Sequence, residues 1–239
     1  MKKLIVIVFL VVSGLVSAQS VTGTSGLIHI PSARMLEDGQ LVIGAAYIPK
    51  PYFFRWGVNE NPGLTTYITY QILPFVELMF RYTHELNRLF LNPNGLDYFP
   101  DRMFSIRFKL LDEKKYIPAI VLGAHDFSKL TGLSSQASVN SMYSATYFVT
   151  SKKIDFKGFI IDTSLGYAFD FLNLETKDYR GIFYGIELKN NNYDFISLII
   201  ENNSKNFNTG FRLSPFRILN IMVGLWDFKK PTFSFNYKF

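Results

Sequence analysis

Apolar and polar residues alternate along most of the chain, in runs of about nine to eleven residues. Leu78, Phe80 and Tyr82, for example, alternate with Glu77 and Arg81. Side chains on a strand point to opposite faces in turn, so each run predicts a strand with one apolar and one polar or small face. No stretch with helical periodicity longer than the first eighteen residues interrupts this pattern. We therefore expect a chain built of β-strands.

Twelve segments carry the strand pattern, and the connections between them alternate in length. Short turns such as Pro74-Phe75 alternate with mostly longer loops such as 85–101, although 202–206 and 227–231 on the longer side are also short. The expected strands are 40–48, 64–72, 76–84, 102–111, 117–126, 141–150, 159–169, 181–189, 193–201, 207–213, 218–226 and 232–239. An even strand number with short periplasmic turns and longer outer loops is typical of outer-membrane barrels. The sequence thus predicts an all-β fold, a transmembrane antiparallel up-and-down β-barrel of about 12 strands and of the outer-membrane type.

A water-soluble barrel would show the same period with its apolar side chains inside, and composition favours the inverted arrangement. Aromatic residues make up 17% of the chain, with 24 Phe and 14 Tyr, which suits a barrel that presents aromatic side chains to lipid. The polar faces hold small and charged residues by turns, as a wet or networked lumen requires. We therefore expect outer-membrane lipid around the barrel.

The last strand is aromatic up to the final residue. Phe233, Phe235, Tyr237 and Phe239 share one face. A soluble protein rarely leaves so aromatic an edge exposed, whereas outer-membrane barrels commonly end on such a strand. We interpret Phe239 as part of an assembly signal that the barrel assembly machinery reads.

The first eighteen residues are typical of a secretory signal. Lys2 and Lys3 precede the apolar run 4–16, and small residues up to Ala18 form a cleavage site. We expect residues 1–18 to be removed and the mature protein to lie in the outer membrane of a Gram-negative bacterium. The barrel then occupies 40–239, and 19–39 forms an N-terminal periplasmic or plug-like segment.

Composition and charge exclude several classes of function. The chain has no cysteine, so we expect no lipid anchor on cysteine, no disulfide and no cysteine-based metal site. The formal charge of +6 falls to +4 once Lys2 and Lys3 are removed. The basic residues scatter over turns and loops without forming a stripe, so we expect no nucleic-acid partner.

The segment before the first strand lacks hydrophobic alternation, and Pro31 interrupts pairing. One interpretation is a turn that orders the start of the first strand, with Asp38-Gly39 as the turn itself. The interpretation we favour places the segment in the barrel mouth or across the periplasmic opening, where it would plug the lumen or meet a partner. We expect Arg34 to pair with a lumen acid, Glu77 or Asp162. The motif residues are Gly26, Pro31, Ser32, Arg34, Asp38 and Gly39.

Charged residues on the polar strand faces form the second candidate site. They are a polar path or binding surface for a sugar chain or other solute, or a salt-bridge network that fills a narrow barrel. A barrel of about twelve strands lies between small filled barrels and water-filled porins, so both interpretations stay open. The set is Glu77, Arg81, Arg107, Lys109, His125, Asp162, Glu187, Glu201, Arg212 and Lys238.

Enzyme chemistry finds little support in the sequence. None of His29, His84 and His125 has a serine two residues away on the same strand face, which a barrel lipase would need. The three histidines are scattered and predict no metal site, and no phosphate loop or nucleotide fingerprint implies a cofactor. Asp162 and Glu187 remain a conceivable carboxylate pair for glycoside cleavage, but nothing in the sequence selects them. We expect no catalytic residues.

Several motifs, in the same order, resemble the YjbH-like family of outer-membrane exopolysaccharide proteins. They are GLIHIPSAR at 26–34, EDGQ at 37–40, DRMFSIR at 101–107, YIPAIVLGAHDF at 116–127 with Thr131-Gly132, and YFVTSK at 147–152. Lys129-Leu130 stands where the family has a glycine-rich run, and longer members are two to three times this length. The resemblance implies a role in exopolysaccharide production or export across the outer membrane, with polysaccharide or periplasmic export partners. The alternatives are a scaffold barrel with a blocked lumen that recruits partners, and a small-solute pore.

Overall fold

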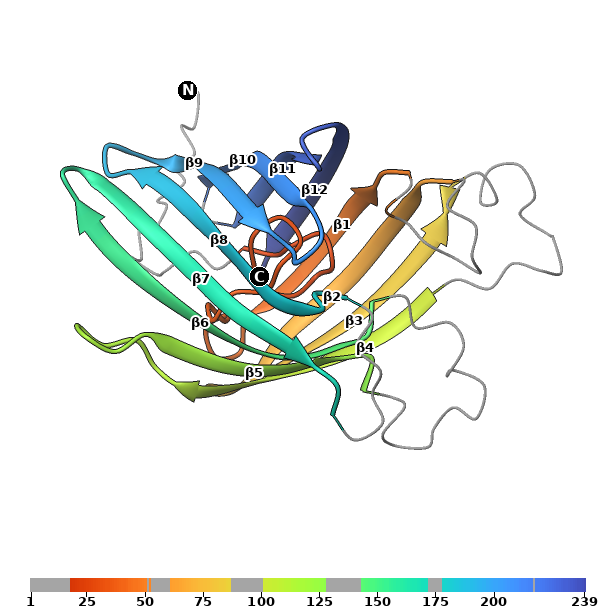
Figure 1. Cartoon of the computed structure of the whole chain (residues 1–239), viewed down its shortest axis with the longest axis horizontal. Helices are drawn as coiled ribbons and strands as arrows, with labels where there is room; N and C mark the ends of the chain where they lie inside the picture. The colour runs from red at the N-terminus through yellow and green to blue at the C-terminus, as the bar shows by residue number, and fades with distance from the viewer. Residues whose placement is uncertain are drawn as a thin grey trace, which may run out of the picture.

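The computed structural model describes residues 18–50, 52, 61–86, 101–127, 143–171, 178–216 and 218–239, and these form one closed barrel. The strands are β1 (Leu41–Ile48), β2 (Gly63–Leu73), β3 (Val76–Glu85), β4 (Asp101–Leu111), β5 (Ala119–His125), β6 (Ala145–Phe156), β7 (Phe159–Phe169), β8 (Gly181–Asn190), β9 (Tyr193–Asn202), β10 (Phe207–Phe216), β11 (Leu219–Trp226) and β12 (Lys230–Lys238). Each strand pairs antiparallel with the next along the chain (Figure 1). The predicted twelve-stranded up-and-down barrel is confirmed.

The barrel closes where the last strand meets the first. β12 pairs with β1 from Tyr47 opposite Phe233 to Val42 opposite Lys238. Closure gives every strand two neighbours, so no strand edge is left to pair with another chain. Among the described residues, no helix is long and apolar enough to cross a membrane.

The connections define two ends of the barrel. One end, called here the short-turn end, carries the turns β2–β3, β4–β5, β6–β7, β8–β9 and β10–β11. The other, the long-loop end, carries the remaining connections, and large parts of its predicted loops lie outside the described residues. Residues 1–17 of the predicted signal peptide also lie outside the described residues.

The hairpin between β6 and β7 differs from the sequence-based expectation. We expected β6 at 141–150 with a turn at 152–155, but β6 runs on to Phe156, opposite Phe159. The turn is the pair Lys157 and Gly158, whose φ angles are 46° and 85°. Two central residues with positive φ make the tight turn that matches strand twist, and glycine adopts that conformation without strain. Lys152, Lys153 and Asp155 suggested a turn, but they lie near the end of β6 at the mouth of the barrel, where charge is tolerated inside a strand.

The outer surface of the barrel is apolar. Large hydrophobic side chains that alternate along the strands are exposed, among them Phe104, Leu165, Ile186, Phe211 and Phe235. Their neighbours in the sequence are buried inside the barrel, as the burial pattern of β12 illustrates. An exterior of this kind is the lipid-facing surface of an outer-membrane barrel.

A lysine at mid-strand should test this lipid-facing assignment. Leu165 lies in the middle of β7 and is exposed, so Leu165→Lys should destabilise the inserted barrel by about 2–4 kcal/mol. Phe159 is exposed on the same strand at its end, so Phe159→Lys should cost about 0–1 kcal/mol. Denaturant unfolding of both variants in lipid bilayers measures the difference. Equal costs would show that the exposed face of β7 does not contact the hydrocarbon core.

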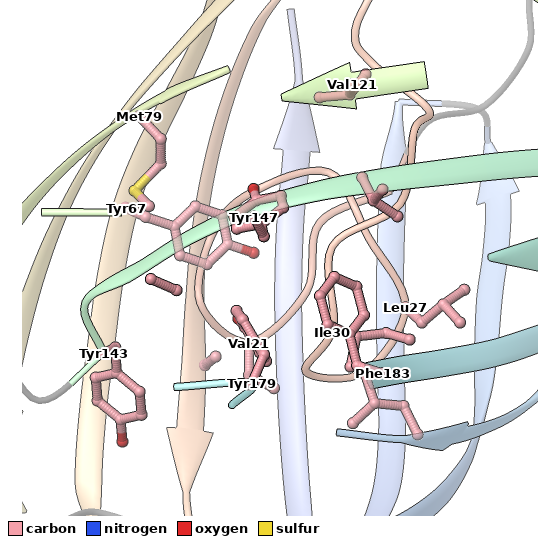
Figure 2. Packing of buried hydrophobic residues seen from close by; sticks show 14 of the residues in the cluster. Val21, Leu27, Ile30, Tyr67, Met79, Val121, Tyr143, Tyr147, Tyr179 and Phe183 are labelled. Carbon is pink, nitrogen blue, oxygen red and sulfur yellow. The ribbon is translucent and has the colours of Figure 1, made fainter. Parts of the chain in front are cut away.

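The segment 19–40, which we call the plug, lies inside the ring of strands (Figure 1). Its residues 19–33 are all buried. Figure 2 shows Val21, Leu27 and Ile30 of the plug among the inward-facing side chains of the wall, including Tyr147 and Phe183. The protein core is therefore formed between the plug and the inner face of the barrel.

Glycines on the wall make room for the inward-facing rings. A Cβ at Gly44 would lie 2.4 Å from Cζ of Tyr67, its partner across β1 and β2. Gly123 meets Tyr147 in the same way across β5 and β6, also at 2.4 Å. Each ring thus lies flat over a position that has no side chain, which leaves lumen volume for the plug.

Candidate functional site: the plugged lumen

The plug enters and leaves at the short-turn end and reaches across the lumen in between. Arg34 contacts Glu113, which lies in the β4–β5 turn. At the opposite end, the His29 ring is bound on both sides, with Nε2 3.1 Å from Asp178 Oδ2 and Nδ1 2.9 Å from Asn203 Nδ2. Asp178 and Asn203 belong to the β7–β8 and β9–β10 connections at the long-loop end. The plug therefore spans the barrel from one mouth to the other.

Glu201 of β9 holds the tip of the plug by its backbone. Its carboxylate accepts the backbone N–H groups of Ile28 at 2.9 Å, His29 at 2.8 Å and Ile30 at 3.4 Å. Asn208 of β10 donates a further hydrogen bond to the same carboxylate, at 2.8 Å. Three successive N–H groups that converge on one anion form a concave anion site in the backbone. Because Glu201 is buried, these donors satisfy a charge that water cannot reach.

Arg212 of β10 complements this arrangement from the other side of the tip. Its guanidinium donates to the carbonyl oxygens of Gly26 at 2.8 Å and Leu27 at 2.9 Å. It also forms an ion pair of 2.8 Å with Glu187 of β8, which in turn accepts from Ser197 at 2.6 Å. The carbonyl groups that precede the tip thus bind a cation, and the N–H groups of the tip bind an anion.

A second buried ion pair holds both arms of the plug. Glu77 of β3 lies 2.7 Å from the Arg107 guanidinium of β4, and both side chains are inaccessible to solvent. The Glu77 carboxylate also accepts the Ser25 hydroxyl at 2.8 Å and the Leu36 N–H at 3.4 Å. Arg107 donates to the carbonyl oxygen of Ser32. Residues 25, 32 and 36 of the plug therefore share one pair of wall charges.

Arg34 closes the short-turn mouth. Its guanidinium binds Asp162 of β7 through two hydrogen bonds of 2.9 and 2.8 Å, and Glu113 at 2.5 Å. Of the two partners expected from the sequence, Arg34 binds Asp162 and not Glu77. Asp162 does stand opposite Glu187 across β7 and β8. Each of these carboxylates is bound by its own arginine, so the two do not form an unoccupied acid–base pair.

The remaining predicted lumen residues lie in the same network or at its ends. Arg81 is buried 3.3 Å from Asp101, and its guanidinium stacks over the Tyr143 ring at 4.4 Å. His125 lies 3.2 Å from the Tyr147 hydroxyl. Lys109 pairs with Asp112 at 2.9 Å at the short-turn end. Lys238 lies at the end of β12, part-exposed.

The other motif residues shape the plug. Gly26 and Pro31 form an isolated bridge that brings the two sides of the tip together. The Ser32 hydroxyl accepts the N–H of Arg34 at 3.3 Å. Asp38 and Gly39 form the exposed turn before β1, and Gly39 has a φ of 75°.

Sequence reasoning did not identify several plug partners, namely Glu113, Asp178, Asn203 and Asn208. Glu113, Asp178 and Asn203 lie in connections between strands, where alternation does not indicate which way a side chain points. Asn208 is on the inner face of β10 but carries no charge. Within the described ranges, no group of three or more histidine, aspartate and glutamate side chains is arranged to hold a metal ion.

Glu113 gives the mouth a predicted dependence on pH. Burial raises the pKa of Glu113, but the Lys153 N–H at 2.9 Å, Arg34 and Lys152 outweigh burial, so its pKa lies below 4.5. A carboxyl group with a lowered folded-state pKa stabilises the fold above its unfolded pKa and loses that contribution as pH falls through the lowered value. The free energy of unfolding of the purified protein should therefore decrease as the pH drops below about 4.5. Glu113→Gln should flatten this part of the unfolding profile, and parallel profiles for both proteins would contradict the assignment.

Comparison with known proteins finds one relative by sequence and two solved structures with weaker similarity. The chain is 27% identical over 139 residues to the "Uncharacterized lipoprotein YjbH" of Escherichia coli (strain K12). That alignment covers 56% of this chain and 17% of the relative, so the chain spans a small part of that protein's length. Among solved structures, the outer membrane protein Omp33 of Acinetobacter baumannii matches with 10% identity and a TM-score of 0.42, over 85% of this chain and 98% of that one. Ail, the attachment invasion locus protein of Yersinia pestis, matches with 9% identity and a TM-score of 0.19, over 84% and 99%.

The family comparison covers most of the barrel. Residues 18–187 match the family described as "Exopolysaccharide biosynthesis protein YbjH". The match begins just before the plug and ends on β8, so it includes the 26–34 motif and the wall charges Glu77, Arg107 and Asp162. This chain belongs to the YjbH family of exopolysaccharide biosynthesis proteins.

Proposed function

We propose that this protein contributes to exopolysaccharide production or export as an outer-membrane barrel whose lumen is blocked by its own N-terminal segment. The observation that supports a blocked lumen is the plug, which is buried from residue 19 to residue 33 and bound at both ends of the barrel. The family description supports the link to exopolysaccharide. The barrel then acts through its two ends, where periplasmic and surface partners reach it, and polymer does not pass through its lumen.

The buried ion pairs favour a plug that stays in place. Moving the plug would break the hydrogen bonds of Glu77, Arg107, Glu201 and Arg212 to the plug, and a hydrogen bond to a charged group contributes about 1.5–3 kcal/mol. A transport path for a sugar chain through the lumen would need these contacts to break. We also propose that residues 1–18 serve as the export signal and are cleaved after Ala18.

A disulfide that fixes the plug to the wall would distinguish a barrel with a blocked lumen from one that transports polymer through its lumen. Ser151 Oγ lies 2.8 Å from the backbone N of Ala33, which brings the two Cα atoms within the span of a disulfide. Ala33→Cys with Ser151→Cys should form that disulfide under oxidation, in a chain that has no other cysteine. A strain that lacks the gene should lose surface polysaccharide, and the oxidised double variant should restore it fully. Each single-cysteine variant serves as the control.

Two outcomes would contradict this function. Restoration by the reduced but not by the oxidised double variant would mean that the plug has to move. Stable single-channel conductance of the wild-type protein in planar bilayers would mean that the lumen is an open pore.

Barrel assembly should depend on the final residue. Phe239 is exposed, its ring packs edge-on against Tyr237 at 4.8 Å, and its N–H donates to Leu41 across the β12–β1 closure at 2.8 Å. We propose that this end is read by the barrel assembly machinery. Deleting Phe239 should lower the amount of folded protein in the outer membrane without lowering its synthesis, as measured on a gel that separates heated from unheated barrel. Phe216→Ala, a similarly exposed end-of-strand change, is the control; unchanged levels after deletion would refute the signal.

A further inference from the structure

A cavity of about 360 Å³ opens at the short-turn end, between the plug and the wall. The plug contributes Leu27, Ala33 and Met35 to its apolar lining, and the wall contributes mainly charged side chains and Ala119. This volume is at the lower end of the range for small-molecule sites. It combines an apolar side with a strongly polar one, as a site for a small amphipathic ring would.

The charged side of the cavity has an excess of cations. Its lining contains five basic side chains and four acidic ones. Arg34 and Arg212 are engaged with the plug and with their own carboxylates, as described above. Lys189 lies 3.3 Å from Glu187, and the partner of Lys109 is the largely exposed Asp112, so both ammonium groups have hydrogen-bonding capacity left.

Lys153 differs from the other cations of the cavity because, among the described residues, no carboxylate pairs with it directly. It lies on β6, half-buried, and its backbone N–H is the group that binds Glu113. Within the part of the chain that the structure describes, its ammonium group forms no ion pair, and Arg34, Lys189, Asp162 and Glu113 act on it only through longer-range charge interactions. A half-buried ammonium group with neighbouring cations attracts an anion, because the surrounding protein screens charge less than water does.

We propose that this cavity binds a carboxylated sugar, with its carboxylate on Lys153 and its ring carbons against Leu27, Ala33 and Met35. The proposal deepens the proposed function, on which it rests, by naming the class of sugar handled at the short-turn end. That end faces the periplasm in a barrel with longer outer loops. The two arginines of the same cavity already bind carboxylates, Asp162 and Glu187, so the environment suits that group. The apolar lining distinguishes a sugar acid from a small inorganic anion.

Binding of three probes to the purified, folded barrel in detergent tests the site. Calorimetric titration uses glucuronate, glucose and inorganic phosphate at low ionic strength. Glucuronate should bind, and Lys153→Gln should weaken it about tenfold or more, the size expected of one charged hydrogen bond. Lys153→Arg should retain binding, and Lys157→Gln, which removes an exposed charge from the same hairpin, should bind as wild type does. Added salt should weaken the binding of glucuronate, because salt screens the attraction between its carboxylate and the basic side chains.

Each other result would overturn the site. Equal affinity for glucose and glucuronate would show that the carboxylate is not recognised. Equal affinity for phosphate and glucuronate would show that the sugar ring is not recognised. Unchanged binding by Lys153→Gln, in a variant that folds normally on a heated-against-unheated gel, would remove the role of Lys153. The proposed function fails separately, since it fails when deletion of the gene leaves surface polysaccharide unchanged, whatever the titration shows.

Discussion

Replacing Glu201 with leucine is expected to release the tip of the plug and to destabilise the protein by at least about 3 kcal/mol. The substitution removes the only carboxylate that accepts the N–H groups of Ile28, His29 and Ile30 in the described structure. Each buried donor that loses its acceptor costs about 1–3 kcal/mol, and Asn208 loses its acceptor as well. Glu201→Gln keeps one acceptor oxygen and should fall between wild type and Glu201→Leu.

Two measurements report on this release. Amide hydrogen exchange of residues 28–30 should accelerate strongly in Glu201→Leu, because these N–H groups become free to open without unfolding the barrel. Planar-bilayer recordings should show current steps that the wild-type protein lacks. Glu37→Gln, at the exposed end of the same plug, is the matched control and should change neither measurement. Slow exchange at residues 28–30 in Glu201→Leu would mean that other contacts hold the tip.

Replacing Arg107 with methionine is expected to cost about 3–5 kcal/mol. Glu77 would keep its negative charge at a site with no solvent access, with only the Ser25 hydroxyl and backbone N–H groups left as donors. The methionine fills similar volume, so the loss reports on charge more than on packing. Denaturant unfolding of the purified barrel measures it.

Neutralising Glu77 should restore most of that loss. The double variant Glu77→Gln with Arg107→Met buries no uncompensated charge, and replacing a buried pair is often close to neutral. The coupling energy from the double-mutant cycle should therefore be large, about 2–3 kcal/mol. Lys109→Met, which removes a part-exposed cation two residues further along β4, is the control and should cost less than about 1 kcal/mol. Additive costs for the first two substitutions would contradict a direct Glu77–Arg107 pair.

The barrel itself could be predicted closely because its cause is local. Successive side chains on a strand face inward and outward in turn, so the alternation around Leu78, Phe80 and Tyr82 is sufficient to assign a face. The prediction was wrong where this alternation gives no information. The β6–β7 turn was placed several residues early, because charged residues near a barrel end look the same in a strand and in a turn.

The contacts of the plug are of a different kind. Glu201 was recognised as an inward-facing charge, but its ligands are backbone N–H groups more than 170 residues earlier in the chain, and backbone groups have no sequence signature. Arg34 was expected to bind either Glu77 or Asp162, and the choice depends on which strand lies beside the returning arm of the plug. His29 had no interpretable role until the fold brought Asp178 and Asn203 to both of its ring nitrogens.

The order of residues alone was thus enough to establish an outer-membrane barrel of twelve strands with a charged interior, since periodicity, turns and lipid-facing aromatics are each encoded within a few neighbouring positions. The occupied lumen, the partners of the wall charges and the place of Lys153 in the cavity at the short-turn end emerge only on barrel closure. They depend on distances between residues far apart in the chain, and those distances are set by strand register and by the volume that the wall leaves free.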